Sequence, residues 1–475
     1  MNPPVLMVNP NRMRPPIAPI GLEYVAAALQ SRGFEPVVCD LTFSEDWRAD
    51  LDSALGAVHP MAVAISIRNL DDAYFASQDF ILEKASEIVL HCADCTDAPL
   101  ILGGVGFSIA PEAVMQFTGA DFGVAGDGEE ALPDLLDAIV DGESAVDIPG
   151  VVFWTDSGEA HANRAAFCDP APLPRRRRFV DHPRYFAEGG QAGIETKRGC
   201  ANRCIYCVEP CAKGGSVRPR HPEQVIDEIK DLLEQGVDVF HLCDSEFNLP
   251  PDHAHAVCAA IESAGLGGRI RWYAYAYPVP FDLELARAMA RAGCAGINFG
   301  VDHTVPAMIR QLGRNYGPED LETTAQACRD AGLAVMFDML LGAPGETRES
   351  LALAIETMRR IAPDRVGLSC GVRVYPNTPL ARKVWAQGPL AANPHLHGAT
   401  ANNDHLLRPI FYVDAKIGNG IHRVVSELVA GDPRFLHADP GQVEGNYNYN
   451  ENSALSNAIR DGARGAYWDI LRRME

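Results

Sequence analysis

Short apolar runs alternate with helical segments along most of this chain, and this alternation restricts the fold more than any other feature. Before residue 150 the runs predict strands at Val5–Val8, Pro36–Cys39, Ala62–Ser66, Leu100–Leu102 and Phe122–Val124, with helices near 21–30 and 80–91. After residue 190 a strand is expected just before Cys200, and five more at Val237–Leu242, Ile270–Tyr275, Gly296–Phe299, Val335–Leu341 and Arg365–Val374. Buried strands that alternate with helices form parallel sheets. The chain is therefore predicted to be α/β, with two βα regions in succession.

The two regions suggest different architectures and a division of the chain. Residues 1–150 are expected to form a doubly wound, Rossmann-like sheet, in which ligands lie at the carboxyl ends of the strands. Residues 151–190 are predicted to be a connector that opens with a hairpin around Val151–Trp154. Residues 191–385 contain six βα units and are predicted to form a partial, TIM-like barrel that is open on one side. Residues 386–475 are assigned to a small, mostly helical C-terminal extension, with helical spacing from Ala454 to Met474.

Charge and hydropathy favour a small-molecule substrate. The net charge of −22 over 475 residues argues against a nucleic-acid partner, which would need basic surface. The basic run Arg175–Arg178 is interpreted as a solvated linker or an internal ion-pair patch. No apolar run approaches the ~20 residues that span a bilayer, and the N-terminus lacks the basic region of a signal peptide. A cytoplasmic protein without a membrane partner is expected.

Three cysteines, Cys200, Cys204 and Cys207, have C-x3-C-x2-C spacing directly after a predicted strand. Thiolates are soft ligands, and three of them can hold three corners of an iron–sulfur cube. The fourth iron would then be free to bind a small chelating molecule. A structural zinc site needs four ligands, and Cys211 has a spacing that zinc modules do not usually show.

Two other groups of metal-ligating residues leave their function open. Cys92 and Cys95 form a C-x2-C pair. The pair could bind a second metal, act as a redox pair, or be incidental. The absence of a second pair nearby favours the incidental pair. His395, His397 and His405 could ligate a metal, but without a carboxylate or cysteine at helical spacing a polar loop is the preferred interpretation.

The cysteine motif resembles that of the radical S-adenosylmethionine superfamily, in which an aromatic residue, here Tyr206, precedes the last cysteine. The resemblance implies a 4Fe–4S cluster whose open iron binds the amino and carboxylate groups of S-adenosylmethionine. Reductive cleavage would normally give a 5′-deoxyadenosyl radical. Five further residues match the superfamily's positions near S-adenosylmethionine: Glu246 for the amino group, Asp302, Gly342, Pro344 in the turn before Glu346, and Arg373 near the carboxylate and the domain seam.

The first domain is similar to the cobalamin-binding domain that precedes the radical module in one large branch of the superfamily. Pro19–Tyr24 and Gly126–Glu129 are typical of this branch. The Asp-x-His-x-x-Gly loop that supplies a cobalt ligand elsewhere is absent, as it is in many members of the branch. Cobalamin is therefore expected without a histidine ligand. Its pocket is assigned to strand-end residues Asn9, Ser66, Arg68, Gly103, Gly104 and Gly126.

The resemblance favours a cobalamin-dependent methyltransferase that acts on a small molecule in natural-product metabolism. In this reading the deoxyadenosyl radical removes a hydrogen and methylcobalamin delivers the methyl group. The alternatives are a radical rearrangement or ring closure, 3-amino-3-carboxypropyl transfer to sulfur or arsenic, and a non-catalytic binding protein. An external one-electron donor of flavodoxin or ferredoxin type is expected. The catalytic residues are unknown, and the candidates are Tyr273, Tyr275, His303 and Cys211.

Overall fold

The first α/β body is built on a seven-stranded sheet with strand order β2-β1-β3-β4-β5-β6-β7. In this computed structural model, residues 3–170, 173, 176–437 and 452–474 are described. Strands β1 to β5 are parallel, and the hairpin strands β6 and β7 continue the sheet in antiparallel fashion. The strands are β1 (Pro4–Asn9), β2 (Glu35–Asp40), β3 (Ala62–Ser66), β4 (Leu100–Gly103), β5 (Phe122–Val124), β6 (Val151–Trp154) and β7 (Ala160–Ala162).

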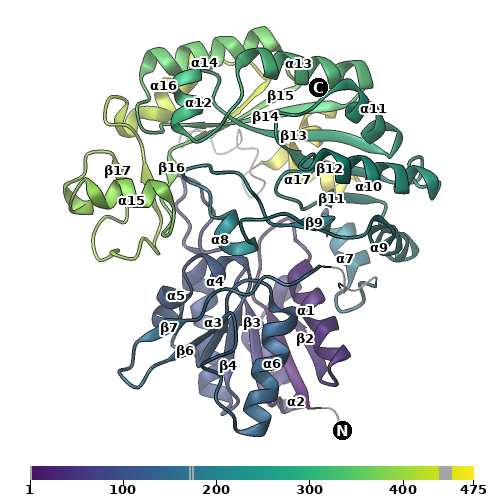
Figure 1. Ribbon diagram of the computed structural model, residues 1–475, viewed down its shortest axis with the longest axis vertical. Helices are drawn as coiled ribbons and strands as arrows, with labels where there is room; N and C mark the ends of the chain where they lie inside the picture. The colour runs from purple at the N-terminus through teal and green to yellow at the C-terminus, as the bar shows by residue number, and fades with distance from the viewer. Residues whose placement is uncertain (1–2, 171–172, 174–175, 438–451, 475) are drawn as a thin grey trace.

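Helices cover both faces of this sheet (Figure 1). They are α1 (Ile20–Ser31), α2 (Trp47–Val58), α3 (Ile81–Cys95), α4 (Val105–Ile109), α5 (Pro111–Thr118) and α6 (Gly128–Asp141). Side chains alternate across a strand, so Val5 and Met7 of β1 pack with α1 and α6, whereas Leu6 and Val8 pack with α2 and α3. This confirms the doubly wound sheet that the sequence predicts.

The second body is a parallel sheet with strand order β19-β15-β14-β13-β12-β11-β8. Its two edge strands, β8 and β19, do not pair with each other among the described residues, so the barrel is open, as predicted. The strands are β8 (Ala192–Ile194), β11 (Val239–Leu242), β12 (Arg271–Ala276), β13 (Cys294–Asp302), β14 (Ala334–Leu341), β15 (Arg365–Cys370) and β19 (Phe435–His437). Short elements between β8 and β11 are α8 (Glu209–Lys213) and the antiparallel pair β9 (Lys197–Arg198) and β10 (Arg218–Pro219).

Helices pack on the outside of the barrel (Figure 1). They are α9 (Pro222–Glu234), α10 (Pro251–Ser263), α11 (Leu283–Arg291), α12 (Pro306–Gln311), α13 (Pro318–Ala331), α14 (Arg348–Ile361) and α16 (Ile421–Val429). Apolar residues of the strands and helices form one continuous core there, with Trp272 among its largest members. None of the described helices combines the length and apolar character needed to cross a membrane.

Two features of the second body differ from the sequence-based prediction. The seventh strand, β19, comes from the C-terminal extension, and its three residues are too few to show a period. The expected strand Arg365–Val374 is split at Gly371, whose φ of +80° turns the chain out of the barrel. Beyond it, β16 (Val372–Arg373) joins β17 (Leu396–Gly398) and β18 (Ile410–Tyr412) in a small antiparallel sheet beside α15 (Pro379–Ala386).

The C-terminal helices α17 (Ser453–Arg460) and α18 (Tyr467–Met474) close one end of the barrel. Trp468 of α18 packs with Tyr273 and Met336, which project inward from β12 and β14. The Tyr273 hydroxyl donates a 2.6 Å hydrogen bond to Asp469 of α18. These inward residues lie near the amino ends of their strands, so α18 plugs the end opposite to the one where barrel enzymes carry their chemistry.

A buried group of charged residues joins the two bodies. It consists of Glu23 and Tyr24 of α1, Arg177 and His182 of the connector, whose helix is α7 (His182–Ala187), and Arg220 and Glu228 at α9. Arg177 contacts Glu228 at 2.9 Å and donates from Nε to Glu23 at 2.6 Å, and Arg220 contacts Glu228 at 2.7 Å. Burial would raise the pKa of Glu23, but Arg177 and His182 keep it below its ordinary value. Arg177 confirms the internal ion-pair interpretation of the basic run.

Candidate active site between the two domains

The cysteine loop follows the carboxyl end of β8 and is fixed to the barrel by its backbone. The N–H of Ile205 donates to the carbonyl of Leu312 at 3.1 Å, and that of Cys200 donates to Gly214 at 3.0 Å. A Cβ on Gly313 would come within 2.4 Å of the Arg203 carbonyl oxygen, so only glycine allows this close approach. Cys200, Cys204 and Cys207 are free thiols on one short loop. Three soft ligands held in this way fit an iron–sulfur cluster with one open iron.

Asp244, at the carboxyl end of β11, anchors the start of this loop. Its carboxylate accepts hydrogen bonds from the N–H groups of Thr196 at 2.8 Å and Lys197 at 3.2 Å, and it pairs with Lys197 Nζ at 3.2 Å. All three residues are buried. Within the acidic segment 244–248, Asp244 therefore holds the backbone, and the ligand contact of Glu246 stays a prediction.

Glu246 lies in a charged network beside the cysteine loop. Arg314 is the centre of this network: its Nε donates to Asp302 at 2.6 Å, its Nη2 donates to the Tyr206 hydroxyl at 3.0 Å, and its Nη1 lies 3.7 Å from Glu246. The Tyr206 hydroxyl also donates to Asp302 at 2.7 Å. Asp302 has a φ of +57°, which is uncommon for a non-glycine residue and typical of functional sites.

This network separates the roles of the two acids. Asp302 is satisfied by protein donors, so it positions Tyr206 and Arg314. The carboxylate of Glu246 is 3.7 Å from its cation, too long for a hydrogen bond, and can accept one from a bound amine. Arg314 was missed by sequence reasoning because it lies in the loop after α12, where no spacing or motif marks it.

The contact predicted between Glu246 and the amino group of S-adenosylmethionine would make ligand binding depend on pH. Burial raises the pKa of Glu246 to about 7, although Arg314 opposes the shift. The ionised carboxylate is the stronger hydrogen-bond acceptor for the amino group. The apparent Kd of the cluster-loaded enzyme should therefore rise about tenfold between pH 8 and pH 6, measured by anaerobic equilibrium dialysis.

Glu246→Gln is the matched variant, because an amide of the same shape does not titrate. Its Kd should be weaker at pH 8 and nearly constant down to pH 6. An equal pH dependence in both proteins would show that another group controls the binding.

A buried pair, His303 and Glu346, stabilises the turn after β14. His303 Nδ1 accepts from the N–H of Val305 at 3.0 Å, so Nε2 carries the proton and donates to Glu346 at 3.3 Å. His303 has no exposed surface. The structure therefore does not support a direct contact between His303 and the substrate. Instead, His303 stabilises the turn that contains Gly342 and Pro344. Glu346 also accepts from Ser350 at the start of α14.

Arg373 lies at the domain seam, where its guanidinium is engaged by protein. Nε donates to Asp71 of the first domain at 2.7 Å, and Nη2 donates to the carbonyls of Leu406 and Leu407 at 3.2 and 3.1 Å. Nη1 donates to the carbonyl of Val374 at 2.5 Å. The seam location agrees with the sequence prediction. The donors have protein acceptors here, and the role in binding the S-adenosylmethionine carboxylate stays a prediction.

Three tyrosines with period two line the inner side of β12 and its carboxyl end, and they have different environments. Tyr273 is packed under α18 and is part of the plug. Tyr277 is adjacent to the charged network, with Arg314 5.2 Å from its ring centroid. Tyr275 is 46% exposed, yet burial raises its pKa to about 12. Of the three, Tyr275 is the most exposed, and its ring stays a candidate for a ligand contact.

The strand-end residues of the first domain also fall into two classes. Asn9 is buried, and its Nδ2 donates to Asp40 at 2.9 Å and to Thr42 at 3.0 Å. A Cβ on Gly104 would come within 2.6 Å of the Ile67 carbonyl oxygen, and one on Gly126 within 2.1 Å of the Ala166 carbonyl oxygen. These residues make close contacts within the protein, and their role in lining a cobalamin pocket stays a prediction.

Arg68, Ser66 and Gly103 differ from that set. Arg68 is exposed, but burial lowers its pKa, and it interacts electrostatically with Cys243 and Tyr275 across the domain boundary. A Cβ on Gly103 would meet only one atom, at 3.8 Å. Arg68 therefore lies close to residues of the second domain. It follows the carboxyl end of β3, the edge of a Rossmann-like sheet at which ligands bind.

The remaining candidate thiol, Cys211, lies on α8 after the cysteine loop and is partly buried. Burial raises its pKa, which disfavours the thiolate. Among the three histidines of the C-terminal segment, His395 Nδ1 accepts from the N–H of Ala415, and its ring stacks on Tyr412. His395 and His405 lie in turns, as predicted, whereas His397 lies in strand β17.

Two family models match the chain. Residues 194–358 match the radical SAM superfamily, and residues 12–136 match the B12 binding domain. Tryptophan 2-C-methyltransferase from Streptomyces laurentii is 33% identical over 446 residues, which span 81% of this chain and 74% of that protein. Cytidylyl-2-hydroxyethylphosphonate methyltransferase from Streptomyces wedmorensis is 22% identical over 392 residues, or 70% of this chain and 71% of that protein.

Solved structures extend this similarity over the whole chain. The radical S-adenosylmethionine methyltransferase TsrM from Kitasatospora setae, with cobalamin and a 4Fe–4S cluster bound, is 31% identical with a TM-score of 0.90 and covers 100% of this chain and 98% of its own. The same enzyme with tryptophan substrate and an S-adenosylmethionine analogue gives a TM-score of 0.91 over 99% of this chain and 98% of its own. The cobalamin-dependent enzyme OxsB, at 17% identity and a TM-score of 0.72, shares the fold.

Proposed function

Because the chain belongs to the branch of the radical S-adenosylmethionine superfamily that carries a B12-binding domain, we propose that it methylates C2 of the indole ring of tryptophan or of a close derivative. One observation carries this proposal: the similarity to TsrM, at a TM-score of 0.91, extends over 99% of this chain, the C-terminal extension included. Specificity elements outside the two common domains are therefore shared in their fold. The predicted setting in natural-product metabolism is part of this proposal.

Three sets of residues would hold the reactants. Cys200, Cys204 and Cys207 would ligate the 4Fe–4S cluster, and Glu246 would accept a hydrogen bond from the amino group of S-adenosylmethionine. Arg68 and the β3–β4 edge would border cobalamin. When bound, these groups supply a one-electron donor with an open iron and a carrier for the methyl group.

The chain's own contribution is orientation and exclusion of water. Arg314 holds Asp302 and Tyr206 in place, so the surroundings of Glu246 are fixed before S-adenosylmethionine binds. Helix α18 closes one end of the barrel, so a substrate would enter from the side of the first domain. Tyr275 and Arg68 interact electrostatically across the domain boundary and are the side chains we assign to contact the substrate or cobalamin.

Two further parts of the proposal concern the cellular setting. We assign the protein to the cytoplasm, and we expect a flavodoxin- or ferredoxin-type protein to reduce the cluster. Such a donor should replace a chemical reductant in turnover. Turnover that needs no external electron source at any stage would contradict this part.

The substrate proposal predicts a specific product. Enzyme loaded anaerobically with the cluster and cobalamin, and supplied with S-adenosylmethionine and tryptophan, should form a compound about 14 mass units heavier than tryptophan. Proton NMR should show loss of the indole C2 proton and a new methyl signal.

Phenylalanine, which lacks the indole ring, is the matched control and should give no methylated product. Methylation of tryptophan at another position, or of neither amino acid while S-adenosylmethionine is consumed, would reject C2 of indole as the acceptor.

A further inference from the structure

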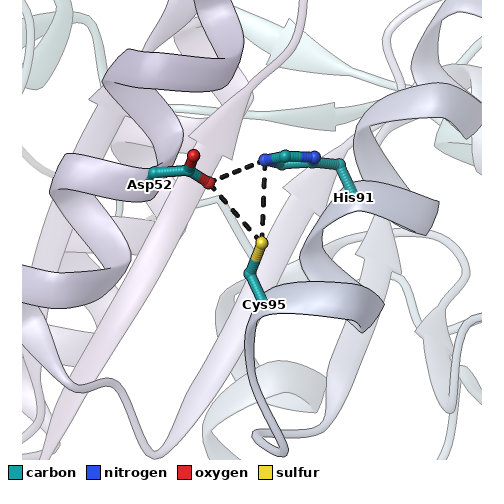
Figure 2. A group of neighbouring side chains, drawn as sticks. All are labelled: Asp52, His91 and Cys95. Atoms are coloured by element: carbon teal, nitrogen blue, oxygen red, sulfur yellow. Dashed lines mark hydrogen bonds and ion pairs between the residues drawn. The ribbon is translucent and has the colours of Figure 1, made fainter.

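A second group of metal-ligating side chains lies on the first domain, outside the residues assigned to the active site. Asp52 of α2 and His91 and Cys95 of α3 point toward one another from neighbouring helices (Figure 2). Asp52 Oδ1 lies 2.7 Å from His91 Nε2 and 3.5 Å from Cys95 Sγ, and Cys95 Sγ lies 3.7 Å from His91 Nε2. Three potential ligands therefore converge on one point.

This geometry differs from that of a nucleophile relay. In a Cys–His–Asp relay the acid binds one ring nitrogen and the thiol binds the other. Here the carboxylate and the thiol both approach Nε2, so His91 cannot pass a proton from one side of its ring to the other. A common approach to a single point is what a bound cation requires.

The distances also match a small tetrahedral ion. Zinc binds oxygen, nitrogen and sulfur at about 2.0–2.3 Å, which places its ligands roughly 3.2–3.8 Å apart. The two separations that involve sulfur, 3.5 and 3.7 Å, are already in this range. The third, 2.7 Å, is a hydrogen bond that a small rotation of the exposed Asp52 side chain would open.

Charge and access favour the same conclusion. A thiolate and a carboxylate together neutralise a divalent cation, and imidazole completes a mixed N, O, S ligand set that suits a borderline metal such as zinc. The side chain of Asp52 is 54% exposed, so the fourth position would be open to water. The His91 ring packs edge-on against Trp47 at 5.4 Å, which fixes its orientation.

We propose that Asp52, His91 and Cys95 form a solvent-accessible zinc site on the surface of the first domain. It changes the interpretation of the Cys92–Cys95 pair, because Cys92 is buried in the core and takes no part. The ligand pair on α3 is instead His91 and Cys95, four residues apart on one helical face. Asp52 comes from another helix, so no sequence motif marks the site.

The test uses the full-length, tag-free enzyme with its cluster assembled, so that the three loop thiols are occupied. After treatment with a chelator, protein is dialysed anaerobically against a series of zinc concentrations, and bound zinc is measured by plasma mass spectrometry. Wild type should bind about one more zinc ion per chain than the triple variant Asp52→Asn, His91→Ala, Cys95→Ser. Each single variant should bind at least tenfold more weakly.

Asp94→Asn is the matched control, since Asp94 is exposed on the same helix and outside the triangle. It should keep the zinc stoichiometry of wild type. Equal zinc binding by wild type and the triple variant, or an equal loss of affinity in Asp94→Asn and in Cys95→Ser, would overturn the proposal. Circular dichroism of each variant separates loss of a ligand from loss of the fold.

Discussion

Replacement of Cys204 by alanine should remove most of the iron and lower methyl transfer at least about a thousandfold, a rise of roughly 4 kcal/mol in the activation barrier. The reason is the number of ligands: a cube with one open iron depends on each of its three thiolates. The same result is expected for Cys200 and Cys207. Iron and sulfide analysis after anaerobic assembly, together with the visible spectrum, measures the loss directly.

Cys211→Ser is the matched control for this experiment. Cys211 lies four residues beyond the motif and is partly buried on α8. Its replacement should leave iron content and turnover within about twofold of wild type. Iron loss in Cys211→Ser comparable to that in Cys204→Ala would mean that the site uses four protein ligands, and the open iron would have to be abandoned.

The second large effect is expected at the buried charges between the domains. Glu228 is fully buried and contacts Arg177 at 2.9 Å and Arg220 at 2.7 Å, and it accepts from the Tyr24 hydroxyl at 2.9 Å. Glu228→Gln keeps the shape but leaves the buried guanidinium of Arg220 without a carboxylate and that of Arg177 with Glu23 as its remaining one. Breaking a buried ion pair typically costs about 3–5 kcal/mol. We expect a loss of this size in the free energy of unfolding, measured in urea.

Asp134→Asn is the control for charge removal alone. Asp134 pairs with Arg32 at 3.0 Å, and both side chains are 45% exposed. Surface pairs of this kind contribute about 0–1 kcal/mol. Similar losses in Glu228→Gln and Asp134→Asn would show that the buried group does not hold the two domains together.

The sequence was sufficient to predict both folds because their signal is local. Apolar runs such as Ala62–Ser66 and Val335–Leu341 are long enough to identify buried strands, and the structure contains both. The three-residue strand β19 and the bend at Gly371 were not predicted, since their conformation depends on the tertiary contacts that surround them.

The site was predictable where a motif marks it and not where long-range pairing decides. The cysteine loop and Glu246 were identified from spacing and resemblance. Arg314 could not be, because its importance arises from contacts with Tyr206, Asp302 and Glu246, which come from three other segments.

Arg373 and His303 show what sequence does not predict. Both were candidates for contact with a ligand, and in the structure each has protein partners for its hydrogen bonds. A sequence can show that a polar residue lies at the end of a strand, but it does not show which groups satisfy its hydrogen bonds.

The most direct test of the central claim follows the methyl group of S-adenosylmethionine. Enzyme loaded with cluster and cobalamin is given S-adenosylmethionine with a trideuterated methyl group, together with tryptophan, and both products are analysed by mass spectrometry. We predict that all three deuterium atoms appear in one methyl group on the indole ring, with S-adenosylhomocysteine as the matching co-product. Deuterium retained in methylthioadenosine, with an aminocarboxypropyl group on an acceptor, would contradict the account.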